Sequence, residues 1–195
     1  MNKNSAQESR RICILACVFW PLYPGYGGAQ AFVIAQTLAQ AGYEVNVVTT
    51  FPINPKGKRS LRYALIAKER WNDIKVIRVP ALRPTSPGLG RKLWFYLSFA
   101  LTSLIALPFI QKADVILGLD PPAPFLLLPG FLFSRLLRAK YIVRVTDLWP
   151  DVVFDFDIAK SRPARKAATL VTTVAYRLAD HIMAFTPRIK PGIMK

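Results

Sequence analysis

The chain has 195 residues, 52% of them hydrophobic, which excludes an intrinsically disordered protein and allows one domain with a substantial core. Its net charge is +16, from 27 lysines and arginines against 11 acidic residues. A chain with this charge attracts anions, and its high hydropathy, with no nucleic-acid recognition motif in the sequence, favours an anionic membrane surface over nucleic acid as a partner.

The start of the chain combines a polar tail with two cysteines. Residues 1–10 are polar and predict a disordered tail. Cys13 and Cys17 lie on one face of a predicted strand, too far apart to bridge each other, and without further cysteine or histidine neighbours they indicate no metal site. We expect buried thiols in a reducing cytoplasm. A secretory signal is the alternative, because two arginines precede an apolar run, but that run is short and meets Pro21.

The residues after the tail predict a βαβ unit. Arg11–Val18 is a near-continuous apolar run typical of a buried parallel strand, and Phe19–Gly28 is a loop rich in proline, glycine and aromatic residues. Ala29–Ala41 has helical spacing and ends at Gly42, a common helix stop, before a second strand at Tyr43–Thr50. This order indicates a parallel sheet with a right-handed crossover.

The segment Phe51–Arg70 carries many lysines and arginines and interrupts the alternation. It is either a solvated loop or a basic rim that contacts phosphates or lipid headgroups. Asp73–Val79, which follows, predicts a third strand that is half polar and therefore lies near an edge of the sheet.

The segment Leu89–Ile110 is apolar and has no charge from Leu93 onward. It reaches the length of a transmembrane helix, but serine, threonine and Pro108 interrupt it, so a buried core helix and a helix lying in the membrane interface are the other two interpretations. The interfacial helix is favoured, because cations and aromatic residues gather at its start. The candidate membrane-docking residues are Arg91, Lys92, Trp94 and Phe95.

The rest of the chain continues to alternate strands with helices. Strands are predicted at Ala113–Leu119, Tyr141–Thr146 and His181–Phe185, and helices at Phe125–Leu137 and Pro163–Leu178. The fold class is therefore α/β, with a doubly wound, mostly parallel, Rossmann-like sheet.

Unusual residues follow three of the predicted strands, where ligands bind in open α/β sheets. Gly27 and Gly28 stand just before a predicted helix and let backbone N–H groups approach a phosphate, although most glycine turns bind no ligand. Asp147 is a candidate base or acceptor of a hydrogen bond from a sugar hydroxyl, and Trp149 stacks on a sugar, lies in the membrane interface or belongs to the core. A helix cap or turn is the structural alternative for the aspartates. The candidate site residues are Gly27, Gly28, Asp120, Asp147, Trp149 and Asp151.

Several sequence blocks resemble the amino-terminal domain of family 4 glycosyltransferases. They include GYGGAQ, ADVILGLDPPAPF, YIVRVTDLWPD and LADHIMAFTP, and their order and spacing extend the resemblance from about Arg11 to Met194. The likeness is closest to the bacterial branch that builds lipopolysaccharide and capsule on lipid carriers.

The resemblance implies one half of a GT-B fold and a retaining transferase that uses a nucleotide-diphosphate sugar as co-substrate, without a cofactor or metal. This half binds the acceptor, a lipid-linked or cell-surface glycan. Gly27 and Gly28 would approach the donor phosphates, while Asp120, Asp147 and Trp149 line the cleft. The helix that starts at Arg91 would match the membrane-docking surface and hold the protein on the inner, cytoplasmic face of the cell membrane.

Two departures from the family change these expectations. Many members have a sugar-contacting histidine where Leu119 or Asp120 stands, so this contact is missing or passes to Asp147. The chain also ends where the linker to the donor-binding domain is expected, which leaves residues 11–195 as an amino-terminal domain alone. It is then half an enzyme that needs a donor domain from another polypeptide, or a truncated remnant. A non-catalytic membrane-associated interaction module is the alternative, and a dinucleotide-dependent oxidoreductase is disfavoured because the glycine fingerprint is absent.

Overall fold

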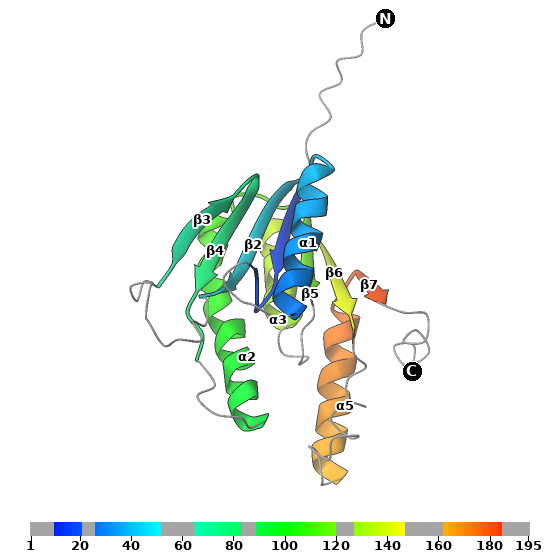
Figure 1. Ribbon diagram of the computed structural model, residues 1–195. Helices are drawn as coiled ribbons and strands as arrows, with labels where there is room; N and C mark the ends of the chain where they lie inside the picture. Colours follow the sequence, from blue (N-terminus) through cyan, green and yellow to red (C-terminus); the bar gives the residue numbers. More distant parts are fainter. Residues whose placement is uncertain are drawn as a thin grey trace, which may run out of the picture.

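The computed structural model describes residues 10–20, 26–51, 65–82, 89–119, 127–146 and 162–184. Its strands form a seven-stranded sheet in the order β3-β4-β2-β1-β5-β6-β7 (Figure 1). Neighbouring strands are parallel except for β3, which pairs antiparallel with β4 at one edge. The predicted mostly parallel sheet is therefore confirmed. The strands are β1 (Arg11–Leu15), β2 (Glu44–Thr50), β3 (Ala67–Trp71), β4 (Ile74–Val79), β5 (Val115–Leu119), β6 (Lys140–Val145) and β7 (His181–Ala184).

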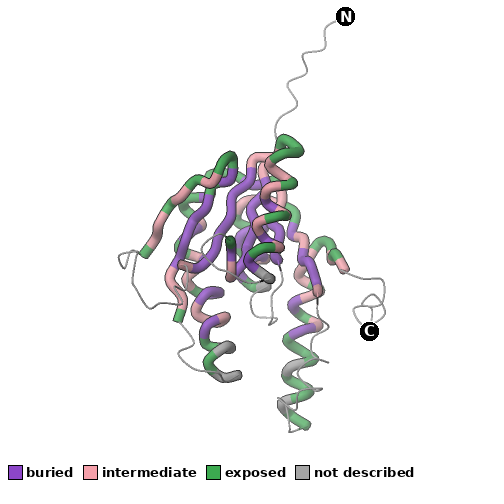
Figure 2. The backbone as a smooth tube through the Cα atoms, in the orientation of Figure 1, coloured by how far each residue is buried: buried purple, intermediate pink, exposed green. Residues whose placement is uncertain are grey.

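Helices cover both faces of the sheet. One face, which we call the α1 face, packs against α1 (Tyr26–Gln40). The other, which we call the α3 face, packs against α2 (Leu89–Ser103), its 3-10 continuation η1 (Leu104–Phe109), α3 (Leu127–Leu137) and α5 (Arg162–Arg177). Because both faces are covered, the central strands are buried along most of their length, as Figure 2 shows.

The positions of glycine and proline explain how α1 ends and how α3 packs against the sheet. Gly42 has φ +87° and ends the α1 turn before β2, as predicted. Pro129 lies in the first turn of α3, where its missing N–H is not needed. Gly130 then lets the α3 backbone lie directly on Tyr141, since a Cβ at this glycine would stand 2.4 Å from the tyrosine ring.

The ends of two predicted elements differ from the structure. β1 ends at Leu15, three residues before the predicted end, because the chain bends there and the Cys17 carbonyl accepts a hydrogen bond from the Thr50 hydroxyl at 2.7 Å. Both cysteines are free and buried as predicted, and burial raises the pKa of Cys13 to about 12. α1 begins at Tyr26 instead of Ala29, so the glycines belong to its first turn. Residues 1–9 of the predicted tail lie outside the described residues.

The basic segment contains a strand that the sequence analysis missed. Ala67–Trp71 forms β3, the antiparallel edge strand, where a loop or basic rim was expected. Its side chains alternate between half-buried and exposed, with Lys68 and Arg70 pointing to solvent. An edge strand with one solvent-exposed face carries charged residues at every second position, so its sequence resembles that of a charged surface loop.

The apolar segment that begins at Leu89 is divided into two parts. α2 ends at Ser103, and η1 continues to Phe109 with Pro108 inside it. Among the described residues, the helices are all too short or too polar to cross a membrane.

Candidate functional site

The sheet has a topological switch point between β1 and β5. From β1 the chain first adds β2 on one side, and the later strands β5, β6 and β7 extend the sheet on the other side. Parallel registers pair Leu15 with Gly118 and Leu119 with Arg144, so β1, β5 and β6 end at the same edge. In open α/β sheets, ligands bind at the carboxyl ends of the strands beside such a switch point.

The first turn of α1 stands at this edge. Gly28 lies in this turn and is buried, and its carbonyl accepts a hydrogen bond from the Trp20 backbone N–H at 3.1 Å. Gly27 is in the same turn. The bond ties the end of the described β1–α1 connection to the helix start, which places the helix N-terminus beside the switch point.

The predicted carboxylates follow the neighbouring strands. Asp120 comes directly after β5, and Asp147 comes two residues after the end of β6. Both aspartates, together with Trp149 and Asp151, lie outside the described residues. The structure thus places the ends of β5 and β6, which precede these residues, at the same edge as the glycine turn of α1.

Arg144 is a site residue that the sequence analysis did not single out. It lies on β6, is 7% exposed, and its Nη1 donates to the side-chain oxygen of Gln30 in α1 at 3.2 Å. Gln30 comes directly after the first turn of α1, so the buried guanidinium lies near the positive end of the helix, and that turn has no acidic residue to offset the charge. This arrangement favours a negatively charged ligand. The signal in the sequence is an arginine inside an otherwise apolar strand.

A second buried arginine lies at the carboxyl end of β4. Arg78 is 1% exposed, and its Nε donates to Glu69 Oε1 at 2.9 Å while Nη1 donates to the Thr50 carbonyl at 3.0 Å. Glu69 also accepts a hydrogen bond from the Trp71 indole at 3.1 Å. Because Glu69 belongs to β3 and Thr50 to β2, this arginine fastens the antiparallel edge strand to the parallel sheet.

The four candidate membrane-docking residues do not share one environment. Arg91 is exposed and Trp94 is 61% exposed, whereas Phe95 is 5% exposed and packs edge-on against Tyr96. Lys92 belongs to α2, but its side chain lies outside the described part. The surface of α2 therefore presents the indole and the guanidinium, and the phenyl ring belongs to the core.

The described residues contain no group of three or more histidine, cysteine, aspartate or glutamate side chains able to hold a metal ion. The described charged groups near the carboxyl ends of β4 and β6 include the guanidinium groups of Arg78 and Arg144, which are hydrogen-bond donors.

A protein-family model described as a glycosyl transferase 4-like domain matches residues 27–190. A comparison with curated proteins gave no match.

Solved structures of UGT89C1 from Arabidopsis thaliana share the fold. The complex with quercetin has a TM-score of 0.56 and 13% identity, and the match covers 95% of this chain and 46% of that protein. The complex with UDP-L-rhamnose has a TM-score of 0.55 and 12% identity, with 94% and 44% covered. The chain thus spans less than half the length of these proteins. At this identity the likeness shows the fold, one Rossmann-like half of a GT-B architecture.

Proposed function

The chain belongs to the glycosyl transferase 4-like domain family, and we propose that it is the acceptor-binding half of a retaining glycosyltransferase. In this proposal a sugar moves from a nucleotide-diphosphate sugar, the co-substrate, to a lipid-linked or cell-surface glycan acceptor. The pathway is the synthesis of lipopolysaccharide or another surface polysaccharide.

The structural neighbours support the classes of ligand. Structures of the Arabidopsis thaliana protein contain UDP, UDP-L-rhamnose or quercetin, which are a nucleotide, a nucleotide sugar and a small molecule. Because the chain matches less than half of that protein, we propose that a donor-binding domain, in the same or a separate polypeptide, completes the site. The chain without that domain is then inactive in transfer.

The observation that carries the proposal is the convergence of β1, β5 and β6 beside the first turn of α1. The N–H groups at Gly27 and Gly28, together with Arg144, supply positive potential for the diphosphate that leaves when the glycosidic bond breaks. The acceptor hydroxyl attacks the anomeric carbon from the face that the diphosphate leaves, which retains the configuration, and Asp147 accepts the hydrogen bond or the proton of that hydroxyl as the bond from sugar to phosphate breaks. Asp120 and Asp151 bind acceptor hydroxyls, and Trp149 stacks on the sugar ring.

Replacing Asp147 tests this role. In cells that carry the complete system, Asp147→Asn should lower sugar transfer to the lipid-linked acceptor at least about 100-fold, because an amide cannot take the proton. Asp73→Asn is the matched control, since Asp73 is on the β3–β4 turn and its side chain is 84% exposed. Transfer that is unchanged by Asp147→Asn in a folded protein contradicts the catalytic role.

We further propose that the protein binds peripherally to the inner face of the cell membrane. Trp94 and Arg91 lie in the first half of α2, which extends beyond the carboxyl ends of the strands in Figure 1. An exposed indole beside a cation suits the headgroup region of an anionic bilayer. The same observation favours the second candidate function, a non-catalytic membrane-associated interaction module, for which Asp147→Asn leaves pathway output unchanged.

Trp94→Ala should weaken co-sedimentation with phosphatidylglycerol vesicles about tenfold, because the indole no longer enters the interface. Val33→Ala is the control, since Val33 is 58% exposed on α1, on the other side of the sheet. Equal binding by the two variants argues against docking through α2.

A further inference from the structure

A cavity lies at the amino-terminal edge of the sheet, opposite the candidate active site. It has a volume of about 400 Å³ and lies between the first residues of three strands and the segment that follows η1. The strands contribute side chains on the α3 face, because each of these residues lies two or four positions before a core residue of that face in its strand. The lining consists of Arg11, Glu44, Asn46 and Lys75 from the strands and Phe109, Gln111 and Lys112 from the segment.

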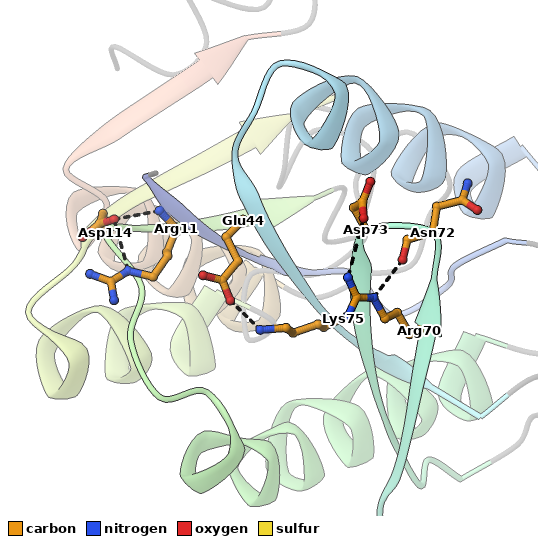
Figure 3. A network of polar contacts seen from close by, with 7 residues as sticks. All are labelled: Arg11, Glu44, Arg70, Asn72, Asp73, Lys75 and Asp114. Carbon is orange, nitrogen blue, oxygen red and sulfur yellow. Dashed lines mark hydrogen bonds and ion pairs between the residues drawn. The ribbon is translucent and has the colours of Figure 1, made fainter. Parts of the chain in front are cut away.

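The acidic groups around the cavity already have partners. Glu44 Oε1 is 2.5 Å from Lys75 Nζ, and Asp114 Oδ2 accepts a hydrogen bond from the Arg11 backbone N–H at 2.7 Å, as Figure 3 shows. Three cationic side chains line the cavity, against the carboxylate of Glu44 in the lining and that of Asp114 beside Arg11, and Lys112 forms no ion pair with a described residue. The cavity is therefore electropositive.

Two further hydrogen-bonding groups at the cavity lack acceptors. Arg11 Nε is buried and has no hydrogen-bond partner, since the nearest oxygen of Asp114 is 3.7 Å away. Asn46 is only 7% exposed, lines the cavity, and no hydrogen bond joins its amide to another described residue. Because Nε has no surface open to the cavity, the amide of Asn46 is the group that an anionic oxygen bound in the cavity can pair with.

We propose that this cavity binds the phosphate or diphosphate group of a ligand. Arg11 and Lys112 supply charge-assisted hydrogen bonds, while Asn46 and Gln111 donate from their amides. The cavity has room for a diphosphate, and it is separate from the proposed transfer site because the strands begin at the cavity and end at that site. The phosphate belongs either to a soluble compound or to a lipid headgroup. The experiments below distinguish the two sources by using pyrophosphate and lipid vesicles as separate probes.

Isothermal titration with inorganic pyrophosphate tests the site directly. Lys112→Glu should raise the pyrophosphate Kd about tenfold, and Gln111→Glu should raise it about threefold, because each places a negative charge beside the ligand. Both residues are exposed, so the variants should fold. Lys166→Glu is the matched control, since Lys166 is exposed on α5, which packs beside α3, and the substitution changes the net charge equally.

The same variants are then sedimented with phosphatidylglycerol vesicles and with phosphatidylcholine vesicles. Pyrophosphate binding that depends on Lys112 but not on Lys166 supports a soluble phosphate ligand. Vesicle binding with the same dependence, and no pyrophosphate binding, assigns the site to a lipid headgroup. Equal losses in Lys112→Glu and Lys166→Glu, or no binding of either probe, overturn the proposal, and neither result bears on Asp147 or on sugar transfer.

Discussion

Two pairs of cationic side chains lie on opposite faces of the sheet and at opposite ends of the strands. On the α1 face they lie at the carboxyl end, where Arg78 and Arg144 are 1% and 7% exposed. On the α3 face they lie at the amino end, where the side chains of Arg11 and Lys75 are 33% and 53% exposed. Each of these four side chains lies near a protein oxygen, but only Arg78 and Arg144 are almost entirely buried.

This difference indicates two uses of the same residue types. A buried guanidinium depends on its protein partner, because removing the partner leaves a charge without solvation. An exposed cation keeps its water and can exchange one anionic partner for another at little cost. Arg78 therefore fastens β3 to the sheet and Arg144 is held in place beside α1, whereas the cations on the α3 face can exchange their partners for a ligand.

The largest expected effect comes from removing the carboxylate that pairs with Arg78. Glu69→Ala should lower the free energy of unfolding by about 3 kcal/mol, since the guanidinium stays buried. Glu44→Ala, which breaks the exposed pair with Lys75, should cost less than about 1 kcal/mol. Urea unfolding measures both. Similar losses in the two variants would remove the distinction between the two ends.

Close packing, not charge, is expected to dominate where α3 meets β6. Gly130→Ala places a methyl group 2.4 Å from the ring of Tyr141, which is 0% exposed and has no room to move. The clash should outweigh the gain in helix propensity and lower the free energy of unfolding by about 2 kcal/mol.

Gly42→Ala is the control for Gly130→Ala, because it meets no atom within 4 Å and should cost only about 1 kcal/mol through its φ of +87°. Adding Tyr141→Leu to Gly130→Ala should recover part of the loss. Failure of this rescue would show that the ring is not the obstacle.

The smallest effect concerns Asp180, at the amino end of the sheet beside β6. The Tyr141 backbone N–H donates to its Oδ2 at 2.8 Å, and this bond lowers the pKa of Asp180. The ionised carboxylate therefore stabilises the fold above the ordinary aspartate pKa, and this contribution disappears as pH falls through the lowered pKa. Asp180→Asn should be less stable by under about 1 kcal/mol near pH 7, with a difference that shrinks below about pH 4.

Thermal unfolding between pH 2 and pH 7 measures this trend. Asp73→Asn serves as the control, because its side chain is 84% exposed and its stability difference should not vary in this way. A difference for Asp180→Asn that is constant with pH would contradict the assigned hydrogen bond.

Local patterns in the sequence predict most of the sheet. Apolar runs mark β1, β5 and β6, because strands covered on both faces contain few polar residues. Gly42 marks the end of α1 for a steric reason that is visible in the residue itself. β3 was not predicted, because the charged side chains on its exposed face resemble those of a loop. The Glu69–Arg78 ion pair that holds β3 on the sheet joins residues of two different strands, and a local sequence pattern does not show such a pair.

The candidate site is predicted only in its outline. Strand order follows from the alternation of elements, so the shared edge of β1, β5 and β6 could be expected. The contact between Arg144 and Gln30 could not, since it joins residues 114 positions apart. Asp147 and Asp120 remain sequence predictions, because they lie outside the described residues. The amino-edge cavity also had no sequence signal, as its lining comes from three strands and one loop.

The burial of both thiols has a practical consequence for experiments on this chain. Cys13 and Cys17 are enclosed in the core of the α3 face, which limits access of maleimide to both, and burial raises the pKa of Cys13 to about 12, so that this thiol offers almost no thiolate at neutral pH. A single cysteine introduced on the surface would accept a fluorophore or spin label without removal of the native ones. Two such cysteines, one at each end of the sheet, would let the distance between the ends be followed by spectroscopy as ligands are added.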